Sequence, residues 1–136
     1  MGGWLGVYGL TALAFVAIDA VWLGWVAPQF YQKHLGHFLR PDPLWIPAVL
    51  FYGVYIAGVV VFAVRPGLES GSVLQAAALG GMLGLMAYAT FDLTSMALFK
   101  DFPTIVVVVD LIWGTVLTAT VAASGVGLGR WVGVGG

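Results

Sequence analysis

Four long runs of apolar residues constrain this chain more than any other feature. They cover residues 4–26, 44–64, 73–99 and 104–128. Each has about the twenty residues that an α-helix needs to cross about 30 Å of hydrocarbon, which is more than the core helix of a soluble domain usually shows. With 61% hydrophobic and only 8% charged residues, the chain also lacks the polar surface of a soluble globular domain. The sequence therefore predicts an integral membrane protein.

The four runs are predicted to be transmembrane helices that form an antiparallel bundle. Lipid offers the backbone no hydrogen-bond partner, so a spanning segment is either a helix or a strand of a closed barrel. None of the runs alternates polar and apolar residues as a barrel strand does. Breakers and charges separate the runs at Pro28, Pro41, Pro43, Arg65–Gly67 and Lys100–Pro103. We expect one all-α domain over 1–136, with both chain ends on one side of the membrane.

Residues Ala27 to Pro43 are predicted to connect the first two helices, and they are compatible with an interfacial segment. The basic residues favour neither orientation, because Lys33, Arg40 and Lys100 share one face while Arg65 and Arg130 share the other. The first run is read as a retained helix rather than a signal peptide, since no basic residue precedes it and it contains Asp19.

Composition excludes several classes of function. The net charge is −1 and the five basic residues are scattered singly, so nucleic acid is not an expected partner. The chain has no cysteine, which excludes disulfides, thiolate metal sites and cysteine nucleophiles. The bilayer itself is the expected surrounding, and no cofactor is indicated.

Three aspartates fall inside the predicted spans and are the candidate proton-handling residues. Asp19 and Asp92 each lie seven residues before the predicted ends of their helices, and Asp110 lies six after the start of the last helix. At 1.5 Å per residue, all three lie about 10 Å below the face that bears the first and third connections. This shared depth predicts that the three carboxyl groups form one site.

Aromatic residues accompany the three acids. Trp22 and Trp113 each lie one turn from an aspartate, Tyr88 precedes Asp92 by one turn, and the second helix offers Tyr52 near mid-membrane. We expect these residues to contact a ligand. A buried acid costs roughly 2.5–3.5 kcal/mol on insertion scales, and the predicted spans hold no Lys, Arg or His to neutralise it. Protons, a bound cation or water must do so.

Two other interpretations of the acids remain open. The aspartates are compatible with a purely structural role, in which they accept hydrogen bonds from facing helices. A di-carboxylate metal site lacks the inward histidine that usually completes it, so no metal site is predicted. Gly80 and Gly84 form a small-xxx-small pair, which favours close packing within the chain over dimerisation.

Several strings resemble a bacterial family of predicted membrane proteins, domain of unknown function 2177. They are Asp19–Gly24, Phe51-Tyr52, Phe62–Val64, Tyr88–Thr94 and Asp110–Thr115. The resemblance spans nearly the whole chain and implies a four-helix protein of the bacterial cytoplasmic membrane. It marks the same three aspartates and adds Thr94 to the candidate ligand-binding residues. It implies no reaction, so any activity must be argued from the site.

The leading functional hypothesis is a membrane-embedded pocket for an apolar or lipid-like molecule, in which the three aspartates manage a proton or a cationic group. An enzyme version would use a protonated aspartate as general acid. The alternatives are a small proton- or cation-coupled transporter and a structural or accessory subunit of a larger membrane complex. Self-association is compatible with each of these hypotheses.

Overall fold

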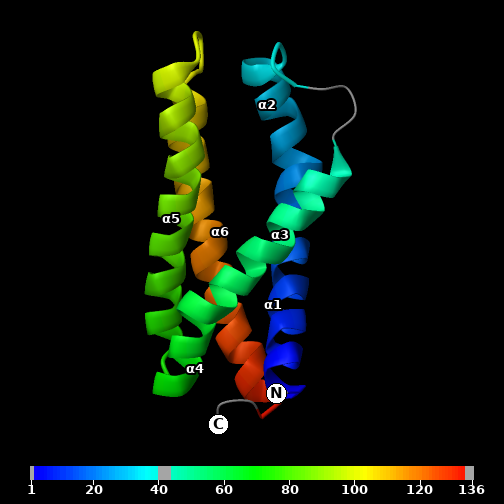
Figure 1. Ribbon diagram of the computed structural model, residues 1–136, viewed down its shortest axis with the longest axis vertical. Coiled ribbons are helices and arrows are strands. Elements are labelled where there is room, and N and C mark those ends of the chain that lie inside the picture. Colours follow the sequence, from blue (N-terminus) through cyan, green and yellow to red (C-terminus); the bar gives the residue numbers. More distant parts are fainter. Residues whose placement is uncertain (1, 40–43, 134–136) are drawn as a thin grey trace.

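Four long helices make up the protein. The computed structural model describes residues 2–39 and 44–133, and within these ranges it contains helices and turns but no strand. Each of the four helices is long and apolar enough to cross a membrane, which confirms the predicted all-α class and the number of spans. Successive long helices run in opposite directions, and the start of α1 and the end of α6 lie at the same end of the molecule (Figure 1). Their placement on one side of a membrane stays a prediction.

Two of the long helices each contain a π-helical turn. The first consists of α1 (Gly2–Val21), the π turn η1 (Trp22–Val26) and α2 (Ala27–Leu35). The second consists of α3 (Trp45–Val59), the π turn η2 (Val60–Val64) and α4 (Arg65–Ser70). The third and fourth are α5 (Val73–Leu98) and α6 (Thr104–Trp131).

The predicted ends of the first two helices, Val26 and Val64, are wrong. The first helix continues to Leu35 and the second to Ser70, through Pro28 and Pro66. In a regular α-helix a proline ring collides with the carbonyl four residues earlier. Here a π turn directly precedes each proline, with the Ala27 N–H bonded to the Trp22 carbonyl and the Arg65 N–H to the Val60 carbonyl. The wider π turn moves the preceding carbonyls away from the proline ring, so the helix continues beyond the proline.

The predicted first connection therefore begins as helix. Residues 27–35 form α2, and the chain turns only after Leu35. The other residues that the sequence analysis assigned to this connection lie outside the described residues. They are Arg40, Pro41 and Pro43. The third and fourth helices match their predicted bounds closely, ending at Leu98 and Trp131 rather than at 99 and 128.

Glycines bring α5 and α6 into close contact. A Cβ on Gly80 would lie 2.6 Å from the Thr118 carbonyl oxygen, and one on Gly84 would collide with the Gly114 carbonyl. Real Cβ atoms do not approach that closely, so only glycine allows the two backbones to meet here. Gly80 and Gly84 thus serve packing within the chain, as the sequence favoured.

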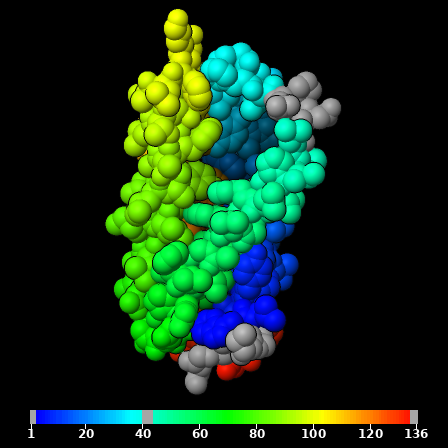
Figure 2. Space-filling view, viewed as in Figure 1, coloured from blue at the N-terminus to red at the C-terminus, as the bar shows by residue number. Residues whose placement is uncertain are grey.

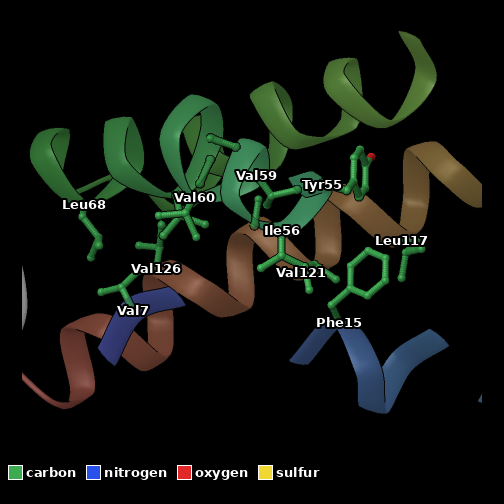
Figure 3. Close-up of a cluster of buried hydrophobic side chains, with 14 residues drawn as sticks. Val7, Phe15, Tyr55, Ile56, Val59, Val60, Leu68, Leu117, Val121 and Val126 are labelled. Atoms are coloured by element: carbon green, nitrogen blue, oxygen red, sulfur yellow. The ribbon is translucent and has the colours of Figure 1, made fainter. Parts of the chain in front are cut away.

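The second helix crosses the bundle diagonally (Figure 1). Its start contacts α1, whereas η2 and α4 contact α5 near the opposite end. Buried side chains from α1, α6 and the second helix meet in one apolar core, which includes Phe15, Val59, Leu68 and Val121 (Figure 3). Because α3 leans away from α5, that core fills one half of the molecule and leaves space in the other.

Candidate functional site

Asp92 and Asp110 face each other across α5 and α6. Asp92 lies six residues before α5 ends at Leu98, and Asp110 lies six after α6 begins at Thr104, so the tight connection sets them at one level. Both side chains are buried, and their carboxyl groups lie close enough to interact. Asp92 Oδ2 receives no hydrogen bond. Two carboxyl groups this close repel each other when both carry a charge.

Tyr31 completes this pair and was not among the residues predicted from the sequence. Its hydroxyl donates a hydrogen bond to Asp110 Oδ1 from α2. The sequence placed this residue in a connection. Even a helix extended past Pro28 would not have identified it, because nine residues at about 100° each put Tyr31 opposite Trp22 on a regular α-helix. The π turn η1 changes that phase, and the two rings lie edge to face with centroids 6.4 Å apart.

Asp19 lies deeper than the other two acids. Tyr52 donates a hydrogen bond of 3.0 Å to its Oδ2, and the Trp113 indole nitrogen lies near the same carboxyl group. Trp113 is one turn beyond Asp110 on α6 and so lies further from the α5–α6 connection. The predicted common depth for Asp19 used Val26 as the helix end, and the extension to Leu35 removes that basis.

The predicted aromatic residues lie between the two levels. The Trp22 and Trp113 rings stack with centroids 4.4 Å apart and an interplanar angle of 11°. The Tyr88 ring packs flat against α6 at Gly114, where any Cβ would collide with it. Its hydroxyl lies near both Asp19 and Asp110. The aromatic residues therefore connect the deep acid with the acid pair.

Thr94 is the one candidate that the structure does not bring to the acids. Its side chain is exposed, and its hydroxyl donates to backbone carbonyls of its own helix, at Thr90 and Phe91. A threonine in an apolar helix satisfies its hydroxyl in this way without any partner on another helix. Its role in ligand binding stays a prediction without geometric support.

Two hollows adjoin the acid pair. The first hollow, of about 320 Å³, is lined by Phe51, Ala87, Tyr88, Phe91, Asp92 and Asp110. The second hollow, of about 330 Å³, is lined by Tyr31, Leu35, Phe38, Leu39, Phe91, Ser95, Phe99, Phe102 and Asp110. Phe91 and Asp110 line both. Figure 2 shows a recess between α5 and the facing helices α2 and α3 in this half of the molecule.

The acids show no geometry suited to a metal ion. In the part of the chain that the structure describes, no three His, Cys, Asp or Glu side chains converge closely enough to hold one. Asp19 is separated from the pair by the level of Trp113, and Tyr hydroxyls occupy one oxygen each of Asp19 and Asp110. The arrangement can hold a proton or a donor group, or a single positive charge, beside Asp92.

The contact between Tyr31 and Asp110 can be tested with a double-mutant cycle. We expect Tyr31→Phe and Asp110→Ala each to lower the free energy of unfolding, with a coupling of about 0.6–1.7 kcal/mol between them. The reversible unfolding of the purified protein in mixed micelles measures these values. Tyr8→Phe paired with Asp110→Ala is the matched control, because Tyr8 donates to the Gly53 carbonyl instead. Additive effects of Tyr31→Phe and Asp110→Ala would contradict the contact.

The fold and the site define a class of protein: a helical membrane protein with four spanning helices and buried carboxyl groups beside an apolar recess. The chain belongs to the family described as Predicted membrane protein (DUF2177), whose pattern matches residues 4–127. That match confirms the resemblance found in the sequence. No curated protein and no solved structure matches the chain.

Proposed function

We propose that the protein binds a single-chain, lipid-like molecule in the two hollows and holds its polar end at Asp92 and Asp110. The observation that carries this proposal is that the hollows share Phe91 and Asp110. Apolar space therefore extends to both sides of the acid pair. A pocket of this kind, with apolar walls and a few convergent polar groups, is typical of small-molecule sites.

The walls suit an alkyl or isoprenoid chain. Aromatic and aliphatic side chains make up most of both hollows, and hydroxyl or carboxyl groups are the minority of the lining. In hydrocarbon a polar group without a partner costs several kcal/mol, so the polar end of a ligand is drawn to Asp92 and Asp110. Asp19 supports the site indirectly, since it lies near the Tyr88 hydroxyl.

Proton handling is the second element of the proposal. A proton shared by Asp92 and Asp110 would relieve their repulsion in the empty site, and a ligand that brings a donor would replace it. We place this activity in the bacterial cytoplasmic membrane, as the family resemblance implies. Catalysis by a protonated aspartate would use the same pair.

Filling the first hollow should weaken binding. Ala87 lines it from α5, and Ala87→Phe places a ring where the chain of the ligand would lie. We expect saturable binding of tritiated dodecanol or dodecylamine to weaken by about tenfold or more, equivalent to about 1.4 kcal/mol. The measurement uses the protein in phosphatidylcholine nanodiscs, with empty nanodiscs subtracted.

Ala97→Phe is the matched control, because Ala97 is an exposed residue of α5 that lines neither hollow. It should bind both probes like the wild type. If wild-type protein shows no saturable binding of either probe, or if Ala87→Phe binds them normally, the proposed function is wrong.

A further inference from the structure

Among the buried acids of the described structure, Asp92 is the one that accepts no hydrogen bond from a tyrosine. Its side chain is 1% exposed, and its Oδ2 receives no hydrogen bond. Its nearest acidic neighbour, Asp110, already accepts a hydrogen bond from Tyr31 at Oδ1. A buried carboxyl group without a donor is costly, and a second carboxyl group beside it raises the cost. This position lacks a group that donates a hydrogen bond and carries a positive charge.

The surrounding helices do not supply that charge. Around the pair, α1 contributes Asp19, α2 contributes Tyr31, α3 contributes Tyr52 and α5 contributes Tyr88. Across the described residues of α1, α3, α5 and α6, the basic side chain is Arg130, which donates to the Gly71 carbonyl at the opposite end of the bundle.

Basic residues of α2 do not fill the gap either. Lys33 and His34 belong to that helix, but neither lines one of the two hollows. The polar side chains that line the first hollow beside Asp92 are therefore the acid Asp110 and the phenol Tyr88. None of them brings a positive charge to the pair.

Aromatic rings surround the same space. Phe51, Tyr88 and Phe91 line the first hollow together with Asp92. The faces of aromatic rings attract organic cations, and the attraction grows when both partners are removed from water. A hydrated metal ion, by contrast, needs several oxygen ligands, and these walls are mostly carbon. The lining therefore favours an alkylammonium group over an inorganic cation.

Resting on the pocket function above, we propose that the polar end held at Asp92 is an ammonium group and that the ligands are cationic single-chain amphiphiles. The ammonium group lies against the Asp92 and Asp110 carboxyl groups and the ring faces, and its alkyl chain occupies the hollows. A neutral alcohol donates one hydrogen bond but leaves the repulsion of the acids unrelieved. A fatty carboxylate adds to that repulsion.

Four probes with the same chain and different polar ends test this inference. Tritiated dodecylamine, dodecyltrimethylammonium, dodecanol and dodecanoate are titrated at pH 7 into the protein in phosphatidylcholine nanodiscs. We expect both ammonium probes to bind about tenfold more tightly than dodecanol, and dodecanoate to bind most weakly. The quaternary probe separates charge from hydrogen bonding, because it cannot donate a hydrogen bond.

Asp92→Asn tests the assigned residue. The substitution keeps the shape of the side chain, and reversible unfolding in mixed micelles checks that the variant folds. The preference for ammonium over dodecanol should fall in Asp92→Asn. It should fall to near unity when Asp110→Asn is added, because the ammonium group lies against both carboxyl groups. Asp101→Asn is the control, because Asp101 is exposed in the α5–α6 connection and its φ of 62° suits asparagine. It should keep the wild-type preference.

The outcomes separate this inference from the proposed function. Equal binding of dodecanol and the ammonium probes would overturn the ammonium assignment and leave the pocket intact. A preference that is unchanged in Asp92→Asn, or displacement of dodecylamine by an equal concentration of sodium ions, would also overturn it. Absence of saturable binding by all four probes would instead remove the pocket function itself.

Discussion

Gly84→Ala is expected to lower the free energy of unfolding by about 1–3 kcal/mol, the usual cost of inserting an atom into a fully packed interface. The new Cβ would collide with the Gly114 carbonyl and lie 2.7 Å from Thr118 Oγ1. Neither the backbone of α6 nor the Thr118 side chain, which is fully buried, has room to withdraw. The two helices must separate, which also shifts Asp92 away from Asp110.

Gly81→Ala provides the matched control on the same helix. Its Cβ would meet Thr115 at 3.5 Å, which is ordinary van der Waals contact. Alanine also has the higher helix propensity, so this variant should be neutral or more stable by up to about 1 kcal/mol. Reversible unfolding in mixed micelles measures both variants. Equal stability of the two would show that α5 and α6 do not pack as closely as described.

Asp92→Leu should raise the free energy of unfolding by about 1–3 kcal/mol, which is the cost of leaving a buried polar group without a hydrogen-bond partner. No hydrogen-bond donor reaches Asp92 Oδ2, and Asp110 keeps the hydrogen bond from Tyr31 when Asp92 is replaced. The adjoining first hollow accommodates the larger side chain. A residue that lowers stability and is nevertheless present fits a functional role better than a structural one.

Asp19→Leu is the comparison that gives this result its meaning. That substitution leaves the Tyr52 hydroxyl without its acceptor, and we expect stability to fall by about 0.6–1.7 kcal/mol. If the free energy of unfolding rises in Asp92→Leu and falls in Asp19→Leu, Asp19 holds the bundle together and Asp92 is retained for a ligand. If Asp92→Leu also destabilises the protein, the structural interpretation of Asp92 gains.

The four spans were predictable because they depend on local properties of the chain. Hydrocarbon thickness sets the length of an apolar run, and lipid compels the backbone to form helices. A charged side chain that faces lipid is costly, so the sequence also predicted that the three aspartates point into the bundle. The structure buries Asp19, Asp92 and Asp110. The meeting of Asp92 with Asp110 also follows from the sequence, since a tight connection joins their helices.

Helix ends at prolines were not predictable in the same way. Pro28 and Pro66 break a regular α-helix, so the sequence favoured ends at Val26 and Val64. Whether a helix stops at a proline depends on the geometry of the turn before it, and a π turn has no clear signature in apolar residues such as Val60–Val64. The error in the first helix placed Asp19 too close to the α5–α6 connection.

The sequence by itself determined that the chain lies in a membrane, that it is all-α and that three aspartates must be buried in the bundle. Composition and the spacing of apolar runs are enough for this, because they set the cost of placing each residue in lipid. Only the tertiary structure decided that Tyr31 reaches Asp110 and that α3 leans away from α5 to leave the two hollows. The rotation of α2 depends on the phase that η1 adds, and the lean of α3 depends on which buried side chains meet at the crossing. Both arise from contacts between residues far apart in the chain, and a local sequence pattern does not predict such contacts.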